Sequence, residues 1–222
     1  MSSPRQRLTF PLPNDGLHRT LEDGTAVLVR PIRPEDKASL EESFERLSAR
    51  SRYRRFFSAM PKLPDGWAEN LTAVDHTTHR AWVVVDPNAT TEVDGADGLG
   101  IAVGRMIVDP DDPTVAEAAF TVLDDYQGRG IGRLLLDAIV SSAALNGIER
   151  IRAETLRDNH GMIQLMKDLG SHRNESRSDH DLVSYEFDVP SIDDADITEG
   201  ALYELLRFVA AYGDQSTGDQ GP

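Results

Sequence analysis

The chain has 222 residues, of which 39% are hydrophobic and 27% are charged, as is typical of a globular protein with one main domain. Lys and Arg number 23 against 38 Asp and Glu, and the resulting net charge of −15 argues against nucleic-acid partners and anionic membranes. With no cysteine, disulfides, cysteine–zinc sites and thiolate nucleophiles are excluded. The sequence has no membrane-spanning apolar run and no signal-peptide pattern, so we expect a cytoplasmic protein.

The N-terminal third predicts a strand followed by two helices. Residues 1–20 are proline-rich and aperiodic, and we expect a flexible lead there. Residues 25–31 alternate in hydrophobicity, which predicts a strand. A helix is predicted from residues 33–36, which supply a proline and two acids to its first turn, through Leu47. Ser51 is the expected cap of the second helix.

A local basic cluster lies around this second helix and contains no acidic residue. It consists of Arg46, Arg50, Arg52, Arg54 and Arg55. We favour a solvated helix face, because charge runs are usually solvated. The alternative is a site for an acidic partner or for the phosphates of a cofactor.

The middle and end of the chain predict a mixed α/β fold. Three β-branched, glycine-punctuated runs predict an antiparallel meander, and helices and strands alternate after it. We therefore expect one central mixed sheet flanked by helices, in a domain spanning residues 21–189. The meander strands are 80–87, 98–108 and 114–123; the later elements are a helix at 130–146, a strand at 150–156, a helix at 161–169 and a strand at 181–189.

An acidic tail, residues 190–222, is predicted to follow the domain. Residues 186–222 carry nine acids and one base. A helix is expected around 198–212, where leucines recur at helical spacing. Its apolar stripe must pack against its own domain or against a second chain, and the second case would give a homodimer.

The stretch with most chemical information places glycines at alternate positions between a strand and a long helix. Gly128, Gly130 and Gly132 allow backbone N–H groups to converge at the helix N-terminus, which suits an anion such as pyrophosphate. A glycine-rich turn without a ligand is the alternative. The spacing matches neither a Walker loop nor the dinucleotide fingerprint.

A strand, then Gln127-x-x-Gly-x-Gly, then a helix closely resembles the acetyl-CoA signature of the GNAT superfamily of N-acetyltransferases. The resemblance implies that loop amides hold the CoA pyrophosphate and that the preceding strand end pairs with the pantetheine arm. Arg157-Asp158-Asn159 resembles the second CoA-binding segment. Many members of the superfamily have a tyrosine at the position of Met166, where it is the general acid toward the departing thiolate. The implied cofactor-binding residues are Val122, Leu123, Asp124, Gln127, Gly128, Arg129, Gly130, Ile131, Gly132, Arg133 and Asn159.

Further motifs resemble the bacterial Pat-type protein lysine acetyltransferase domain. They are Asp23-Gly24, residues 30–36 and residues 47–57, and the whole match covers about residues 20–189. This resemblance implies transfer of acetyl from acetyl-CoA to lysine side chains of cytoplasmic proteins. Acetylation of a small amine or amino acid is an alternative, since the same cofactor site would serve it. A non-catalytic acyl-CoA sensor is an alternative of another class.

Glu117 is the candidate general base. It is the only acid in the apolar strand that leads into the glycine loop, and Pat-type domains have their catalytic glutamate at the matching position. Partial burial there would favour proton uptake from an ammonium group. A backbone amide near Val122 is the expected oxyanion donor. Alternatively, Glu117 is a solvent-facing strand residue. His76 and His79 have no third ligand at useful spacing, so no metal site is predicted.

Overall fold

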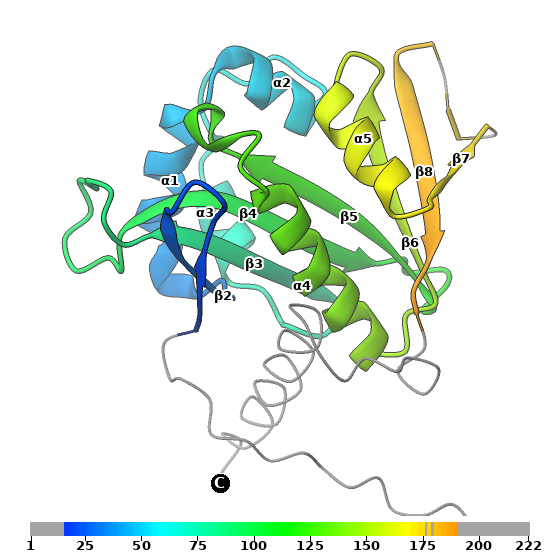
Figure 1. The fold of residues 1–222 in the computed structure, drawn as a ribbon, viewed down its shortest axis with the longest axis horizontal. Coiled ribbons are helices and arrows are strands. Elements are labelled where there is room, and N and C mark those ends of the chain that lie inside the picture. Colours follow the sequence, from blue (N-terminus) through cyan, green and yellow to red (C-terminus); the bar gives the residue numbers. More distant parts are fainter. Residues whose placement is uncertain (1–15, 176, 179, 191–222) are drawn as a thin grey trace, which may run out of the picture.

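Eight strands form one sheet in a computed structural model that describes residues 16–175, 177–178 and 180–190. Their spatial order is β1-β2-β3-β4-β5-β6-β8-β7 (Figure 1). The strands are β1 (Leu17–Thr20), β2 (Ala26–Pro31), β3 (His79–Asp86), β4 (Leu99–Val108), β5 (Val115–Val122), β6 (Arg150–Leu156), β7 (His172–Asn174) and β8 (Leu182–Asp188). The helices are η1 (Pro34–Asp36), α1 (Lys37–Arg46), α2 (Ala49–Phe56), α3 (Trp67–Thr72), η2 (Asp124–Tyr126), α4 (Ile131–Leu145) and α5 (His160–Asp168).

The sheet is mixed, as the sequence predicts. Neighbouring strands from β1 to β5 pair antiparallel, as do β6 with β8 and β8 with β7. The pair β5–β6 is parallel, because α4 crosses over between them. The register shifts between Val84 and Val85 of β3, which pair with Ala102 and Gly100. Ile101 is therefore the extra residue of a bulge in β4.

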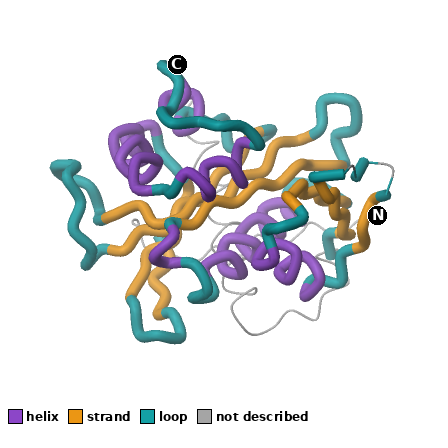
Figure 2. Tube along the Cα trace, turned by 90° about the horizontal axis from the view of Figure 1, so that it is seen from above, coloured by secondary structure: helices purple, strands orange, loops and turns teal. Residues whose placement is uncertain are grey.

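Helices cover both faces of the sheet (Figure 2). On one face α4 packs against β3, β4 and β5. Gly104 permits this approach, because a Cβ there would lie 3.2 Å from the Cβ of Leu135. Trp82 on β3 is buried and donates a 2.9 Å hydrogen bond to the Ser142 hydroxyl of α4. These contacts fix the position of α4, and therefore of its N-terminus, over the sheet.

The opposite face carries α1 and α3. A small apolar cluster of Leu28, Val83, Val85 and Val103 belongs to this face. Beside it, the buried guanidinium of Arg30 pairs with the carboxylate of Asp36 at 2.6 Å and with that of Asp97 at 2.9 Å. Burial alone would lower the pKa of Arg30, but the two carboxylates outweigh it and raise the pKa above its usual value. This pairing ties the η1–α1 segment to β2.

Several local predictions were incomplete or wrong. Residues 17–20, expected to be flexible, form β1 on the sheet edge because their backbone pairs with β2. The cap of α2 is Ser48, whose hydroxyl accepts the Ser51 amide, and not Ser51 itself. The sequence did not predict α3 or β7, both of which are short. The remainder of the predicted lead, and the tail helix at 198–212, lie outside the described residues.

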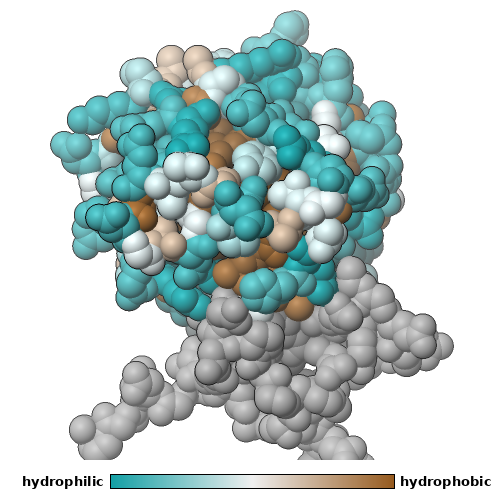
Figure 3. All heavy atoms as spheres, turned by 60° about the vertical axis from the view of Figure 1, so that its left-hand side comes forward, coloured by the Kyte–Doolittle hydropathy of each residue, from teal (hydrophilic) through white to brown (hydrophobic). Residues whose placement is uncertain are grey.

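Within the part of the chain that the structure describes, no helix has the length and apolarity needed to cross a bilayer. On the face drawn in Figure 3, hydrophobic residues form small patches surrounded by hydrophilic ones. The large exposed hydrophobic side chains among the described residues are Tyr53, Phe57, Trp67 and Ile107.

Candidate active site

Strands β5 and β6 lie together at one end and separate at the other. Their paired residues run from Val115 with Arg150 to Glu117 with Arg152, although both strands continue beyond these pairs. Glu117 therefore lies at the point where the gap between the two strands begins, which we call the apex of the gap. The Arg152 guanidinium is occupied by the carboxylates of Glu186 at 2.7 Å and Asp109 at 3.0 Å.

The separated part of β5 presents backbone groups to this gap. The amide of Leu123 donates to the carbonyl of Ile101 on β4. Since backbone groups of successive strand residues point to opposite sides, those of Phe120 and Val122 point away from β4 and toward the gap. An extended amide-containing chain can add to such an edge.

A cleft of about 560 Å³ occupies this region. It lies between α2, the end of β5, the glycine loop, the N-terminal turn of α4 and the length of α5. Most of the predicted cofactor-binding residues line it: Val122, Gln127, Gly128, Gly130, Ile131, Gly132, Arg133 and Asn159. The structure therefore brings together the two segments that the sequence assigned to one cofactor.

The glycine loop has the geometry of an anion site. Gly128 and Gly130 have φ of 75° and 85°, a left-handed conformation that favours glycine. A Cβ at either position would meet nothing within 4 Å, so the loop is open on that side. Gly130 caps α4, whose first-turn amides have no partner within the helix and mark its positive end. The loop amides and the edge of β5 thus fit the pyrophosphate and the pantetheine of CoA.

Two predicted residues hold the walls of the cleft in place. The Gln127 amide donates to the Val122 carbonyl at 3.1 Å and to the Ser51 hydroxyl at 3.2 Å, and so joins the loop, β5 and α2. The Asn159 side chain accepts the amide of Met162 and caps α5.

Three predicted cofactor-binding residues do not line the cleft: Leu123, Asp124 and Arg129. Leu123 is buried in the main core. Asp124 accepts hydrogen bonds from the amide and hydroxyl of Ser48 and from the hydroxyl of Ser51. Arg129 pairs with Asp23 at 3.1 Å and lies over the ring of Tyr126. These side chains support the loop from outside.

Glu117 is exposed, whereas we expected partial burial in its apolar strand. The reason is its face: alternation places it with Thr121 on the α1–α3 side, and the exposed Ile107 lies directly opposite on β4. The helices do not cover this end of the sheet. Glu117 is not in the lining of the cleft but lies at the apex of the strand gap.

Most arginines of the basic cluster around α2 bond to other groups of the protein. We expected either a solvated helix face or a site for an acidic partner or for phosphates, and neither interpretation describes all five. Arg46 pairs with Glu42, and Arg50 and Arg54 pair with Asp158. Arg52 donates to backbone carbonyls and lies over the Phe44 ring. Arg55 is the exception, because it lies against the ring of Phe56 and lines the cleft.

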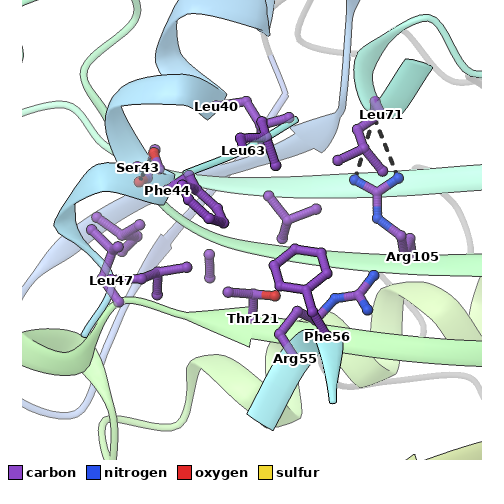
Figure 4. Close-up of a pocket in the computed structure, with 15 residues that line it drawn as sticks. Leu40, Ser43, Phe44, Leu47, Arg55, Phe56, Leu63, Leu71, Arg105 and Thr121 are labelled. Carbon is purple, nitrogen blue, oxygen red and sulfur yellow. Dashed lines mark hydrogen bonds between the residues drawn. The ribbon is translucent and has the colours of Figure 1, made fainter. Parts of the chain in front are cut away.

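A second, smaller pocket adjoins the cleft on the α1–α3 side, and sequence reasoning missed it. Arg55 and Thr121 line both spaces. Figure 4 shows Arg55 and Phe56 entering from α2 and Arg105 from β4, with the Arg105 guanidinium turned toward the Leu71 carbonyl. The one available signal was Arg105 itself, a basic residue in the otherwise apolar run of β4.

Two further predictions concern the missing general acid and a metal site. Met166, which replaces the tyrosine of many relatives, is fully buried in the core and supplies no acid. Among the described residues no cluster of His, Cys, Asp and Glu could hold a metal ion.

A sequence model of the acetyltransferase (GNAT) family matches residues 46–170. The chain therefore belongs to the GNAT acetyltransferase family. This confirms the predicted fold and enzyme class, and it agrees with acetyl-CoA as the acyl donor.

Among curated proteins, the chain is similar to the acetyltransferase Pat of Mycolicibacterium smegmatis, with 38% identity over 165 residues. The match covers 74% of this chain and 46% of that protein, so the chain spans about half of its relative. Among solved structures it is similar to the GNAT domain of S. lividans PAT, with 31% identity and a TM-score of 0.68, covering 81% of this chain and 99% of that one. A cAMP-binding acyltransferase from Mycobacterium smegmatis matches with 29% identity and a TM-score of 0.59, covering 91% of this chain and 56% of that one. The predicted Pat-type resemblance is confirmed.

Proposed function

We propose that the chain transfers the acetyl group of acetyl-CoA to lysine side chains of proteins, with Glu117 as general base. The observation that carries the proposal is the place of Glu117 at the apex of the gap between β5 and β6. A pantetheine arm paired with the edge of β5 would direct its thioester toward this apex. The similarity to Pat proteins supports a protein acceptor.

The reaction is direct attack by an amine on the thioester carbonyl. Glu117, directly or through a water, takes a proton from the lysine ammonium, and the neutral nitrogen bonds to the carbonyl carbon. Of the backbone amides near Val122 that point into the gap, that of Phe120 lies nearest to the apex and is the proposed oxyanion donor. The C–S bond then breaks with its electron pair on sulfur, and the nitrogen loses its second proton to water. A thiolate is a moderately weak base, with a typical pKa of about 8.5, so it can leave without an acid at Met166.

The open face around Glu117 favours a bulky acceptor. Ile107, 47% exposed, is its cross-strand neighbour. Exposed Trp67 on α3 packs edge-on against Phe56 of α2 and adds an apolar surface on the same side of the sheet. A lysine presented on a protein can approach Glu117 from this side, while acetyl-CoA occupies the cleft.

The test is transfer of labelled acetyl from acetyl-CoA to a cytoplasmic protein extract and, separately, to a panel of small amines. The Glu117→Gln variant removes the base but keeps the size of the side chain. We expect discrete labelled proteins with the wild type and a loss of about 100- to 10,000-fold in rate with the variant, the range for removing a general base. Lysine should be the labelled residue.

Acetyl-CoA affinity, measured by calorimetry, should change less than about twofold in Glu117→Gln, because binding rests on the loop and strand backbone. Glu149→Gln, an exposed acid outside the site, is the matched control and should retain full activity. If only the small amines are labelled, the protein-acceptor proposal is wrong and the chain acetylates a small amine. If acetyl-CoA binds but no acetyl group is transferred to either acceptor, the chain is a non-catalytic acyl-CoA sensor.

A further inference from the structure

The small pocket beside the cleft has an apolar interior and a cationic end. It has a volume of about 60 Å³, and leucine and phenylalanine side chains of α1, α2 and the α2–α3 segment form most of its wall. A site for one water needs about 10–15 Å³, so the space suits a group of about five non-hydrogen atoms. It adjoins the cleft at Thr121 and Arg55, which line both spaces.

Arg105 lies at the cationic end and is buried, with 5% of its surface exposed. Its partners are neutral: it donates to the Leu71 carbonyl at 3.3 Å and to His79 Nε2 at 2.9 Å. Burial and the charge of Arg105 both lower the pKa of His79, so His79 is the neutral acceptor at neutral pH. Within the described residues, no carboxylate lies at ion-pair distance from Arg105 or Arg55.

The charge of Arg55 disfavours the charge of the buried Arg105 guanidinium. The pKa of Arg105 is lowered to about 9, first by burial and then by the charge of Arg55. Burial also lowers the pKa of Arg55, against the opposing effect of Glu117. Among the described residues, Arg105 has no carboxylate acting on it in this way, and an anion between the two guanidinium groups would relieve the cost of its buried charge.

The site of the anion relative to the reaction is fixed by the strand register. Arg105 lies opposite Ala119 on β5, between Thr121 at the cleft and Glu117 at the apex, on one face of the sheet. The small side chain of Ala119 leaves space above the strand. An acyl chain that extends from the thioester carbonyl on this face of the sheet would therefore come within reach of the two arginines.

We propose that this pocket binds the terminal carboxylate of a short dicarboxylic acyl group, so that the chain transfers succinyl-class acyl groups as well as acetyl. The inference rests on the proposed acyl transfer and adds a second donor class. A succinyl group places two methylenes and a carboxylate beyond its carbonyl, five non-hydrogen atoms, which matches the volume of the pocket. Bidentate pairing with guanidinium is the strongest form of carboxylate recognition.

The transfer step is the one already described. The lysine ammonium gives its first proton to Glu117, the nitrogen bonds to the thioester carbon, the C–S bond breaks with its electrons on sulfur, and the second nitrogen proton passes to water. The distal carboxylate takes no part in bond making and stays ionised on the arginines.

The experiment compares acetyl-, butyryl- and succinyl-CoA as donors to a cysteine-free lysine peptide. Butyryl is the neutral analogue of succinyl, with a methyl in place of the carboxylate. Released CoA is followed with a thiol reagent, to which this cysteine-free protein contributes no background. The rate without protein is subtracted. Calorimetric titration with succinyl-CoA and butyryl-CoA gives a second readout that needs no turnover.

We expect succinyl-CoA to exceed butyryl-CoA at least tenfold in kcat/KM and in affinity. Arg105→Met should lower the succinyl-to-butyryl ratio about 100-fold, the usual effect of removing one partner of a desolvated charge pair. Arg105→Lys keeps the charge and should lower it less. Arg80→Met, which removes a half-buried arginine of β3 that bonds Asn146, is the control and should leave the ratio unchanged.

Equal use of butyryl and succinyl by the wild type would overturn the inference and make the pocket a site for apolar acyl chains. An equal loss with all three donors in folded Arg105→Met would also overturn it, because the arginine would then act at the reacting carbonyl. If no lysine is acylated but succinyl-CoA still binds more tightly through Arg105, the carboxylate site stands, and the proposed function fails together with succinyl transfer.

Discussion

The α4 side of the sheet offers mainly backbone groups to the cleft, whereas the α1–α3 side offers buried arginines. On the first side, the loop glycines and the edge of β5 present amides whose positions follow from the chain path. On the second side, Arg30 has two carboxylate partners, and Arg105 has only neutral ones. A site made from backbone recognises what every donor shares, and a site made from side chains can distinguish one substrate from another.

Arg30→Met tests the arginine side and has the largest expected effect on stability. It leaves the carboxylate of Asp36 buried without its partner, which should lower the free energy of unfolding by about 3–5 kcal/mol. Urea unfolding followed by circular dichroism measures this loss. The double variant Arg30→Met/Asp36→Leu removes both charges and should recover most of it. If the double variant is as unstable as the single one, packing and not charge is the cause.

Gly130→Ala tests the backbone side. A side chain at φ of 85° should cost about 1–2 kcal/mol of stability, and its Cβ enters the open side of the loop. We expect acetyl-CoA binding, measured by calorimetry, to weaken about tenfold or more, the equivalent of ~1.4 kcal/mol.

Gly147→Ala is the matched control for this variant. Gly147 has a similar φ of 73° and equally open surroundings, but lies beyond the other end of α4. It should lose similar stability and keep its CoA affinity. An equal loss of affinity in both variants would mean that strain in α4, and not the loop, weakens binding.

Asp124 joins the two sides and gives the smallest expected effect, a dependence of stability on pH. Burial would raise its pKa, but hydrogen bonds from Ser48 and Ser51 outweigh burial and lower the pKa below its ordinary value. Because the folded-state pKa is depressed, the stabilisation is present above the unfolded pKa of about 3.9 and is lost as pH falls through the folded value.

The melting temperature of the wild type should therefore fall more steeply between about pH 5 and pH 3 than that of Asp124→Asn. Parallel curves for the two proteins would show that other carboxylates cause the acid sensitivity.

Much of the fold could be predicted because the strands and helices carry clear periodicity. The run from β3 to β6 with α4 between the last two was predicted to within a few residues. The short elements α3 and β7 were missed, since so few residues establish no period. The strand β1 depends on pairing with β2 and has little pattern of its own.

Prediction of the site divides in the same way. The glycine loop and Asn159 line one cleft, and their motif spacing indicated this proximity because it fixes the backbone geometry. Leu123, Asp124 and Arg129 belong to the same motif, but tertiary partners take up their side chains. Arg55 on α2 and Arg105 on β4 are far apart in the sequence but close enough for their charges to interact, and no local pattern indicates this proximity. The exposure of Glu117 depends on how far the helices extend over the sheet.

The bridge that Gln127 makes to Ser51 and to the Val122 carbonyl has a kinetic consequence. Donor phosphates at the glycine loop would fix Gln127, and through Ser51 they would fix α2, whose Phe56 packs against Trp67 on the acceptor side. The acceptor surface would then be complete only after the donor has bound. Uptake of the two substrates should follow a compulsory order, donor first, and free CoA should compete with the donor while it inhibits noncompetitively toward the acceptor.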